Sequence, residues 1–175
     1  MTEISGKLRN AAIAIAAIGL GLVLFFASQV QGGQISLESL AQRAVPLEVA
    51  QANGKPTLIE FYADWCTSCR QMAPTVAELE ESFAGDINFV MLNVDNTKWL
   101  PELTSYRVNG IPHFEFLDGG GQSLGTAIGE QPKLILASNL TALRDRLPLT
   151  NAANTGQVSN FEAPIGDSTQ PRSHG

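Results

Sequence analysis

The stretch Leu58-Ile-Glu-Phe-Tyr-Ala-Asp-Trp-Cys-Thr-Ser-Cys-Arg-Gln-Met-Ala-Pro74 decides the expected fold. It opens within the short apolar run 57–62, which is typical of a buried strand. From Cys66 onward, apolar residues recur with the spacing of one face of an amphipathic helix, at Met72, Val76, Leu79 and Phe83. We therefore expect Cys66 to lie where a strand ends and a helix begins.

The two cysteines of the sequence, Cys66 and Cys69, are three residues apart at this helix start. Unpaired N–H groups and the positive end of the helix dipole favour a thiolate there, and the thiolate is the form that attacks a disulfide. Cys69 follows one turn later, where it can resolve the mixed disulfide. This predicts thiol–disulfide exchange without a metal or organic cofactor. A structural disulfide or half of a zinc site is the alternative, and the strand-then-helix context disfavours it.

Glu60 is an acidic residue inside the apolar run that precedes the cysteines. A buried, unpaired carboxylate costs several kcal/mol, so burial would raise its pKa and let it exchange a proton with Cys69. The alternative is a solvent-facing glutamate on an edge strand. The residues alone leave the two readings open.

The rest of the central region alternates helical and strand patterns, which predicts an α/β domain at residues 36–147 with a mixed sheet flanked by helices. Early helices are expected around 36–44 and 47–53, and a strand at 87–94. Later elements are a helix near 100–106, a hairpin of 113–117 and 123–128 around the glycine turn 119–121, and a last helix carrying Leu136, Leu140, Leu143 and Leu147.

An apolar run precedes this domain, since residues 11–27 contain no polar side chain and the apolar character continues to Val30. Twenty helical residues span roughly the 30 Å of a bilayer core, which predicts a transmembrane anchor at 11–30 in contact with lipid. A cleaved signal peptide is the alternative. Lys7 and Arg9 precede the run, and by the positive-inside rule they keep residues 1–10 in the cytoplasm and export the remainder, to a periplasm or thylakoid lumen.

The segments on either side of the domain are polar. Residues 31–35 are expected to form a short tether, and residues 148–175 a disordered tail rich in small and polar side chains. The net charge of −6 offers no basic patch for phosphates, so nucleic acid is not an expected partner. Metal binding is not expected either, because the two histidines, His113 and His174, fit no ligand spacing.

Three motifs resemble the thioredoxin family. Trp65-Cys-Thr-Ser-Cys-Arg-Gln-Met-Ala-Pro74 is similar to its active-site signature, Gly110-Ile111-Pro112 to its cis-proline loop, and Gly129 stands where the family has a glycine after the last strand. The resemblance covers about residues 56–147. It implies a thioredoxin-like fold and protein-disulfide reductase activity on protein disulfide substrates.

The stretch from Pro46 to Cys66 is more narrowly similar to membrane-anchored thioredoxin-like proteins of thylakoids and cyanobacteria, the TxlA type. That resemblance implies a lumen-facing reductant used in cytochrome assembly and supplied with electrons by a membrane thiol carrier.

The resemblance also implies roles for individual residues. Cys66 matches the nucleophile and Cys69 the resolving thiol of the redox-active disulfide. Trp65 matches the indole packed beside the site. Ile111 and Pro112 match the loop that pairs with extended substrate backbone. Glu60 stands where thioredoxins hold a buried aspartate, which favours the proton-shuttle reading.

Four residues depart from the ordinary thioredoxin pattern. Thr67-Ser68 replaces Gly-Pro between the cysteines, so the redox potential of ordinary thioredoxins cannot be assigned to this pair. Met91 stands where thioredoxins often have a lysine near the buried acid. His113, directly after Pro112, adds a titratable group to the loop or is an ordinary polar loop residue.

The leading hypothesis is an exported, membrane-tethered dithiol reductant of protein disulfides. An oxidase or isomerase in the same compartment is one alternative, since direction depends on redox potential. A non-redox binding module that holds extended polypeptide on the Pro112 loop is another, and the intact cysteine pair argues against it.

Overall fold

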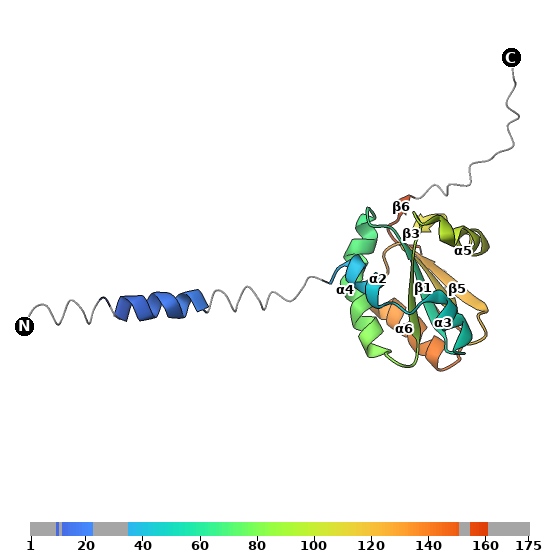
Figure 1. Ribbon diagram of the computed structural model, residues 1–175. Helices are drawn as coiled ribbons and strands as arrows, with labels where there is room; N and C mark the ends of the chain where they lie inside the picture. The colour runs from blue at the N-terminus through green and yellow to red at the C-terminus, as the bar shows by residue number, and fades with distance from the viewer. Residues whose placement is uncertain (1–9, 11, 23–34, 151–154, 161–175) are drawn as a thin grey trace, which may run out of the picture. The chain divides into compact units, whose positions relative to one another are not determined.

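The computed structural model describes residues 10, 12–22, 35–150 and 155–160, and the chain divides into two compact units, 1–34 and 35–175 (Figure 1). In the first unit the described residues 10 and 12–22 are helical. Among the residues described, no helix combines the length and apolar character that crossing a bilayer requires. Several parts of the predicted N-terminus, anchor and tether lie outside the described residues, namely 1–9, 11 and 23–34.

A four-stranded mixed sheet forms the centre of the second unit (Figure 1). Its order is β2-β1-β4-β5, in which β1 is parallel to β2 and antiparallel to β4, and β4 and β5 form an antiparallel hairpin. All six residues of β1 are buried, because this strand is central and both of its faces are covered. The predicted mixed sheet is confirmed. The strands are β1 (Thr57–Tyr62), β2 (Asn88–Asn93), β4 (His113–Leu117) and β5 (Ser123–Ile128).

Helices flank this sheet at the places where the sequence pattern predicts them (Figure 1). They are α2 (Leu37–Arg43), α3 (Leu47–Ala52), α4 (Thr67–Ser82), α5 (Leu100–Ser105) and α6 (Lys133–Arg144), and a 3-10 turn, η1 (Thr97–Trp99), leads into α5. The helix α2 packs against α4 and β2. The face of α4 that carries Met72, Val76 and Leu79 is buried, as the helical spacing predicts.

The last helix is shorter than its leucine spacing predicts. Leu136, Leu140 and Leu143 are buried, but Leu147 lies beyond the end of α6 and is 57% exposed. The helix stops because Arg146 adopts a left-handed conformation with φ 58°. The backbone N–H of Arg146 donates to the backbone oxygen of Leu143, and the backbone N–H of Leu147 donates to the backbone oxygen of Ala142. This pair of bonds is the Schellman pattern of a helix C-terminus.

Part of the predicted disordered tail is ordered, which corrects the expectation for residues 155–160. Thr155 forms a parallel bridge with Ile128, and β6 (Ser159–Asn160) pairs antiparallel with β3 (Gly110–Ile111). The composition of residues 148–175 is polar, but main-chain pairing needs no apolar side chains and composition therefore did not reveal it. Residues 151–154 and 161–175 lie outside the described residues.

Candidate active site

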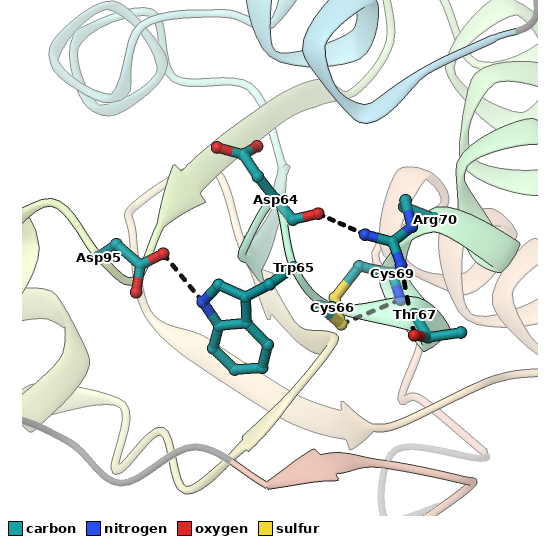
Figure 2. The surroundings of a disulfide bond; sticks show 7 residues. All are labelled: Asp64, Trp65, Cys66, Thr67, Cys69, Arg70 and Asp95. Carbon is teal, nitrogen blue, oxygen red and sulfur yellow. Dashed lines mark hydrogen bonds between the residues drawn. A yellow bond between two sulfur atoms is a disulfide. The ribbon is translucent and has the colours of Figure 1, made fainter.

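Cys66 and Cys69 are joined by a disulfide at the N-terminus of α4 (Figure 2). Cys66 is the N-cap residue, with an extended backbone, and its sulfur accepts a hydrogen bond of 3.0 Å from the N–H of Cys69. In the reduced protein the same N–H and the dipole of this 16-residue helix favour negative charge on Cys66. Local sequence thus places Cys66 at a helix start, where a thiolate is favoured.

Arg70 closes the turn that leads into the disulfide (Figure 2). Its Nη1 donates to the backbone oxygen of Asp64 at 2.6 Å, and its Nη2 donates to the hydroxyl of Thr67 at 3.3 Å. These bonds connect the end of β1 to the first turn of α4. Both cysteines have 0% exposed surface, so the disulfide is buried beneath the residues of this turn and its neighbours.

Trp65 lies beside the disulfide with its indole half exposed, at 48% (Figure 2). Its Nε1 donates to Oδ2 of Asp95 at 3.0 Å, and the backbone N–H of Asp95 donates to Oδ1 of Asn93 at 2.9 Å. The loop after β2 therefore orients the indole at the rim of the site. Asp95 carries no local sequence signal of this role, because its contact with Trp65 spans 30 residues.

The Ile111–Pro112 peptide bond is cis, and both residues are buried. The backbone oxygen of Pro112 accepts a hydrogen bond of 2.7 Å from the N–H of Gly129. His113, which follows, is the β4 partner of Phe61 near the end of β1. Since β1 leads directly to Cys66, this register brings the cis-proline loop to the same end of the sheet as the disulfide.

Glu60 is buried in the centre of the sheet at 1% exposure. Neither carboxyl oxygen has a hydrogen-bond partner among the described residues, and burial raises the pKa of Glu60 to about 8. A cavity of about 10 Å³, lined by Glu60, Val76 of α4 and Met91, has room for about one water. The alternative of an exposed glutamate on an edge strand is wrong, because β1 has a partner on each side.

A second buried polar cluster surrounds Glu115 and was missed from the sequence. Nε2 of His113 lies 3.3 Å from Oε2 of Glu115, and both side chains are almost fully buried. The hydroxyls of Ser123 and Thr126 on β5 donate to the Glu115 carboxylate. The i, i+2 spacing of His113 and Glu115 places both side chains on one face of a strand, and it could have predicted their contact. His113 is therefore a buried, partnered residue of β4.

The site geometry agrees with comparisons to known proteins. The family model described as Thioredoxin matches residues 38–142. The chain belongs to the thioredoxin family. It is 53% identical over 171 residues to the thiol:disulfide interchange protein TxlA homolog of Synechocystis sp., covering 97% of this chain and 95% of that relative.

Two further relatives match over most of the chain. The thiol:disulfide interchange protein TxlA of Synechococcus elongatus is 46% identical, over 98% of this chain and 92% of its own length. The chloroplastic thioredoxin-like protein HCF164 of rice is 46% identical, over 89% of this chain and 61% of its own length. Family membership and the capped cysteine pair together make this thioredoxin-family chain a thiol–disulfide oxidoreductase.

Proposed function

We propose that the chain is a membrane-anchored dithiol reductant that reduces disulfides of proteins outside the cytoplasm. The observation that carries the proposal is the position of Cys66 as N-cap of α4, with its sulfur accepting from the N–H of Cys69. This position favours the thiolate of Cys66, the species that opens a client disulfide.

The reaction balances with the two cysteines alone. The thiolate of Cys66 attacks one sulfur of the client disulfide, and the other client sulfur leaves as a thiolate. The thiolate of Cys69 then attacks the sulfur of Cys66, so the client leaves fully reduced and the Cys66–Cys69 disulfide forms. Two electrons have passed to the client, and a thiol carrier in the membrane would return them to the cysteines.

Glu60 supplies the proton step in this proposal. Its pKa of about 8 is near that of an ordinary thiol, about 8.5, so the carboxylate accepts a proton from Cys69 with little energetic penalty. The released client thiolate takes up a proton in turn.

Trp65, Ile111 and Pro112 form the client-binding rim in this proposal. The exposed indole presents an apolar surface. The backbone at Gly110 and Ile111, which pairs with residues 159–160 in this structure, would pair with an extended client strand in their place.

The anchor and its orientation are the second part of the proposal. The uninterrupted apolar run 11–27 and the preceding Lys7 and Arg9 support a single pass, with the N-terminus in the cytoplasm and the thioredoxin-like domain in a periplasm or thylakoid lumen. The names of relatives, interchange proteins from cyanobacteria and a chloroplastic protein, support a thylakoid setting. Cytochrome assembly is the client process that the resemblance suggests.

Redox titration tests the direction of electron flow. The full chain in detergent is equilibrated with glutathione or dithiol buffers, and the fraction of Cys66–Cys69 disulfide is measured by thiol alkylation. A potential near the thioredoxin value of about −270 mV supports a reductant, whereas one near about −120 mV indicates an oxidase.

Trapping tests whether the site reacts with clients. Cys69→Ser should accumulate mixed disulfides through Cys66, and the matched variant Cys66→Ser should not. If clients bind Cys69→Ser without any mixed disulfide, the chain is a binding module instead. Protease added to sealed vesicles of known orientation tests topology, and digestion from the cytoplasmic face alone would refute the export of the domain.

A further inference from the structure

The described part of the C-terminal region, residues 155–160, runs along the strand end that follows β5. Thr155 bridges Ile128 in parallel, and the N–H of Gly156 donates to the oxygen of Ile128 at 2.7 Å. The N–H of Glu130 donates to the oxygen of Gln157 at 2.8 Å. Main-chain hydrogen bonds therefore hold the segment against residues 128–130.

The same segment then pairs with the strand that leads into the cis-proline. Ser159 is the antiparallel partner of Ile111, and Asn160 is the partner of Gly110 (Figure 1). Pro112 follows this strand directly, and its oxygen is bonded to Gly129 on the other side. Segment 155–160 thus engages both stretches of backbone that flank Pro112.

Two glycines allow the close approach. A Cβ on Gly156 would lie 1.8 Å from the backbone oxygen of Glu130, and a Cβ on Gly129 would lie 2.7 Å from the backbone of Gly156. The side chain of Val158 packs over Gly110, where a Cβ would meet it at 3.5 Å. Contacts this close indicate that the segment fits specifically against the backbone at Gly110 and at residues 129–130, which we call the client groove.

The family match does not account for this segment, because the thioredoxin model ends at residue 142. A short strand offers few main-chain donors and acceptors, and extended polypeptides bind by pairing with such groups. A client that pairs with Gly110 and Ile111 must therefore displace residues 159–160.

We propose that segment 155–160 is an internal ligand of the client groove, an extended piece of the chain's own C-terminal region that competes with client polypeptide for the backbone beside Pro112. This inference rests on the proposed function, in which that backbone receives the client. The segment acts on polypeptide clients, which must compete with it for the backbone of β3, and not on small disulfides, which do not pair with that backbone.

Truncation of the full chain in detergent tests the inference. Ending the chain after Thr150 removes the segment, and ending it after Asn160 retains it as the matched control. With insulin as the protein disulfide, we expect the shorter chain to have a KM at least threefold lower, with its redox potential and its rate with a small aromatic disulfide unchanged. The chain ending at Asn160 should behave as the full chain does.

A binding measurement separates failure of this inference from failure of the proposed function. A fluorescent extended peptide with serine in place of cysteine is titrated onto the oxidised chains, so no electron transfer is needed. Truncation after Thr150 should lower its Kd at least threefold, and a synthetic peptide of residues 155–160 should restore the weaker binding. An equal or higher Kd would overturn the inference, whatever the direction of electron flow.

A point substitution repeats the test at constant chain length. Gly156→Val forces the segment away from Glu130 and should lower the peptide Kd as truncation does. Gly120→Val, in the exposed turn of the hairpin at a glycine without positive φ, is the matched control and should leave the Kd unchanged. If Gly156→Val binds the peptide no better than Gly120→Val, the segment does not compete.

Discussion

Glu60 and Met91 are register partners in the parallel pairing of β1 with β2, and both line the same small cavity. The neighbour of the buried carboxyl on that strand is thus an uncharged thioether, at the position where thioredoxins often carry a lysine. Without a cation there to favour the carboxylate, burial dominates, and it raises the pKa of Glu60 to about 8. We therefore expect the stability of the fold to depend on pH.

Glu60→Gln should remove a pH dependence of stability. The folded-state pKa of Glu60 lies above its ordinary value of 4.5, so the folded protein holds the proton more tightly and the free energy of unfolding falls as pH rises from 4.5 through 8. At 1.36 kcal/mol per pKa unit the loss reaches at most about 5 kcal/mol. Urea denaturation of the oxidised proteins from pH 5 to pH 9 measures it, and parallel curves for the two proteins would contradict the assignment.

Asp95→Ala should loosen Trp65 without unfolding the domain. The hydrogen bond from the indole to Asp95 is exposed, so we expect a stability change below about 1 kcal/mol and a KM for insulin raised roughly two- to fivefold. A double-mutant cycle with Trp65→Phe checks the cause. In the Trp65→Phe variant, Asp95→Ala should have no further effect on KM. If the effect of Asp95→Ala on KM is as large there as in the unsubstituted chain, Asp95 does not act through the indole.

Glu115→Ala should destabilise the domain by about 2–4 kcal/mol, because it leaves the buried His113 without its partner and the hydroxyls of Ser123 and Thr126 without their acceptor. Chemical denaturation measures the change. Glu81→Ala, on the exposed surface of α4, is the control and should stay within about 0.5 kcal/mol. Equal effects of the two substitutions would show that the cluster contributes nothing.

Gly129→Ala should release segment 155–160. Gly129 has φ 81° and its backbone lies against Gly156 and Gln157, so a methyl group is both strained and obstructed. Gly54→Ala is the control, since Gly54 also has a positive φ, 71°, but a Cβ added there would meet no atom within 4 Å. Hydrogen exchange should show the amide of Gly156 losing protection in Gly129→Ala alone, and retained protection there would contradict the prediction.

Most of the secondary structure could be predicted because it depends on neighbours a few residues apart. The buried strand at 57–62, the stripe of α4 and the hairpin around residues 119–121 all follow from local periodicity. Leu147 shows the limit of that reasoning, because its spacing continues the helix while the left-handed turn at Arg146 ends it. A non-glycine residue at that position carried no stop signal.

Some features of the candidate site likewise follow from local sequence, whereas others depend on tertiary contacts. The strand-to-helix junction at Cys66 and the Cys66–Cys69 spacing are local, so the redox centre could be identified before the fold was known. The burial of Glu60 could not, since it depends on strands pairing on both edges of β1 and on residues such as Leu40 and Val76 covering that face of the sheet. The hydrogen bond from Trp65 to Asp95 joins residues 30 positions apart and follows only from the assembled sheet.

By itself, the sequence determined the chemistry of this protein: two thiols one turn apart at a helix start, with an acid in the strand before them. Those features are set by bond geometry and short-range periodicity, which need no tertiary contacts. Only the tertiary structure decided which groups surround that chemistry. The central position of β1 sets the pKa of Glu60, and the pairing of residues 159–160 with β3 places the chain's own end beside Pro112. Such contacts join residues distant in sequence, and packing alone selects them.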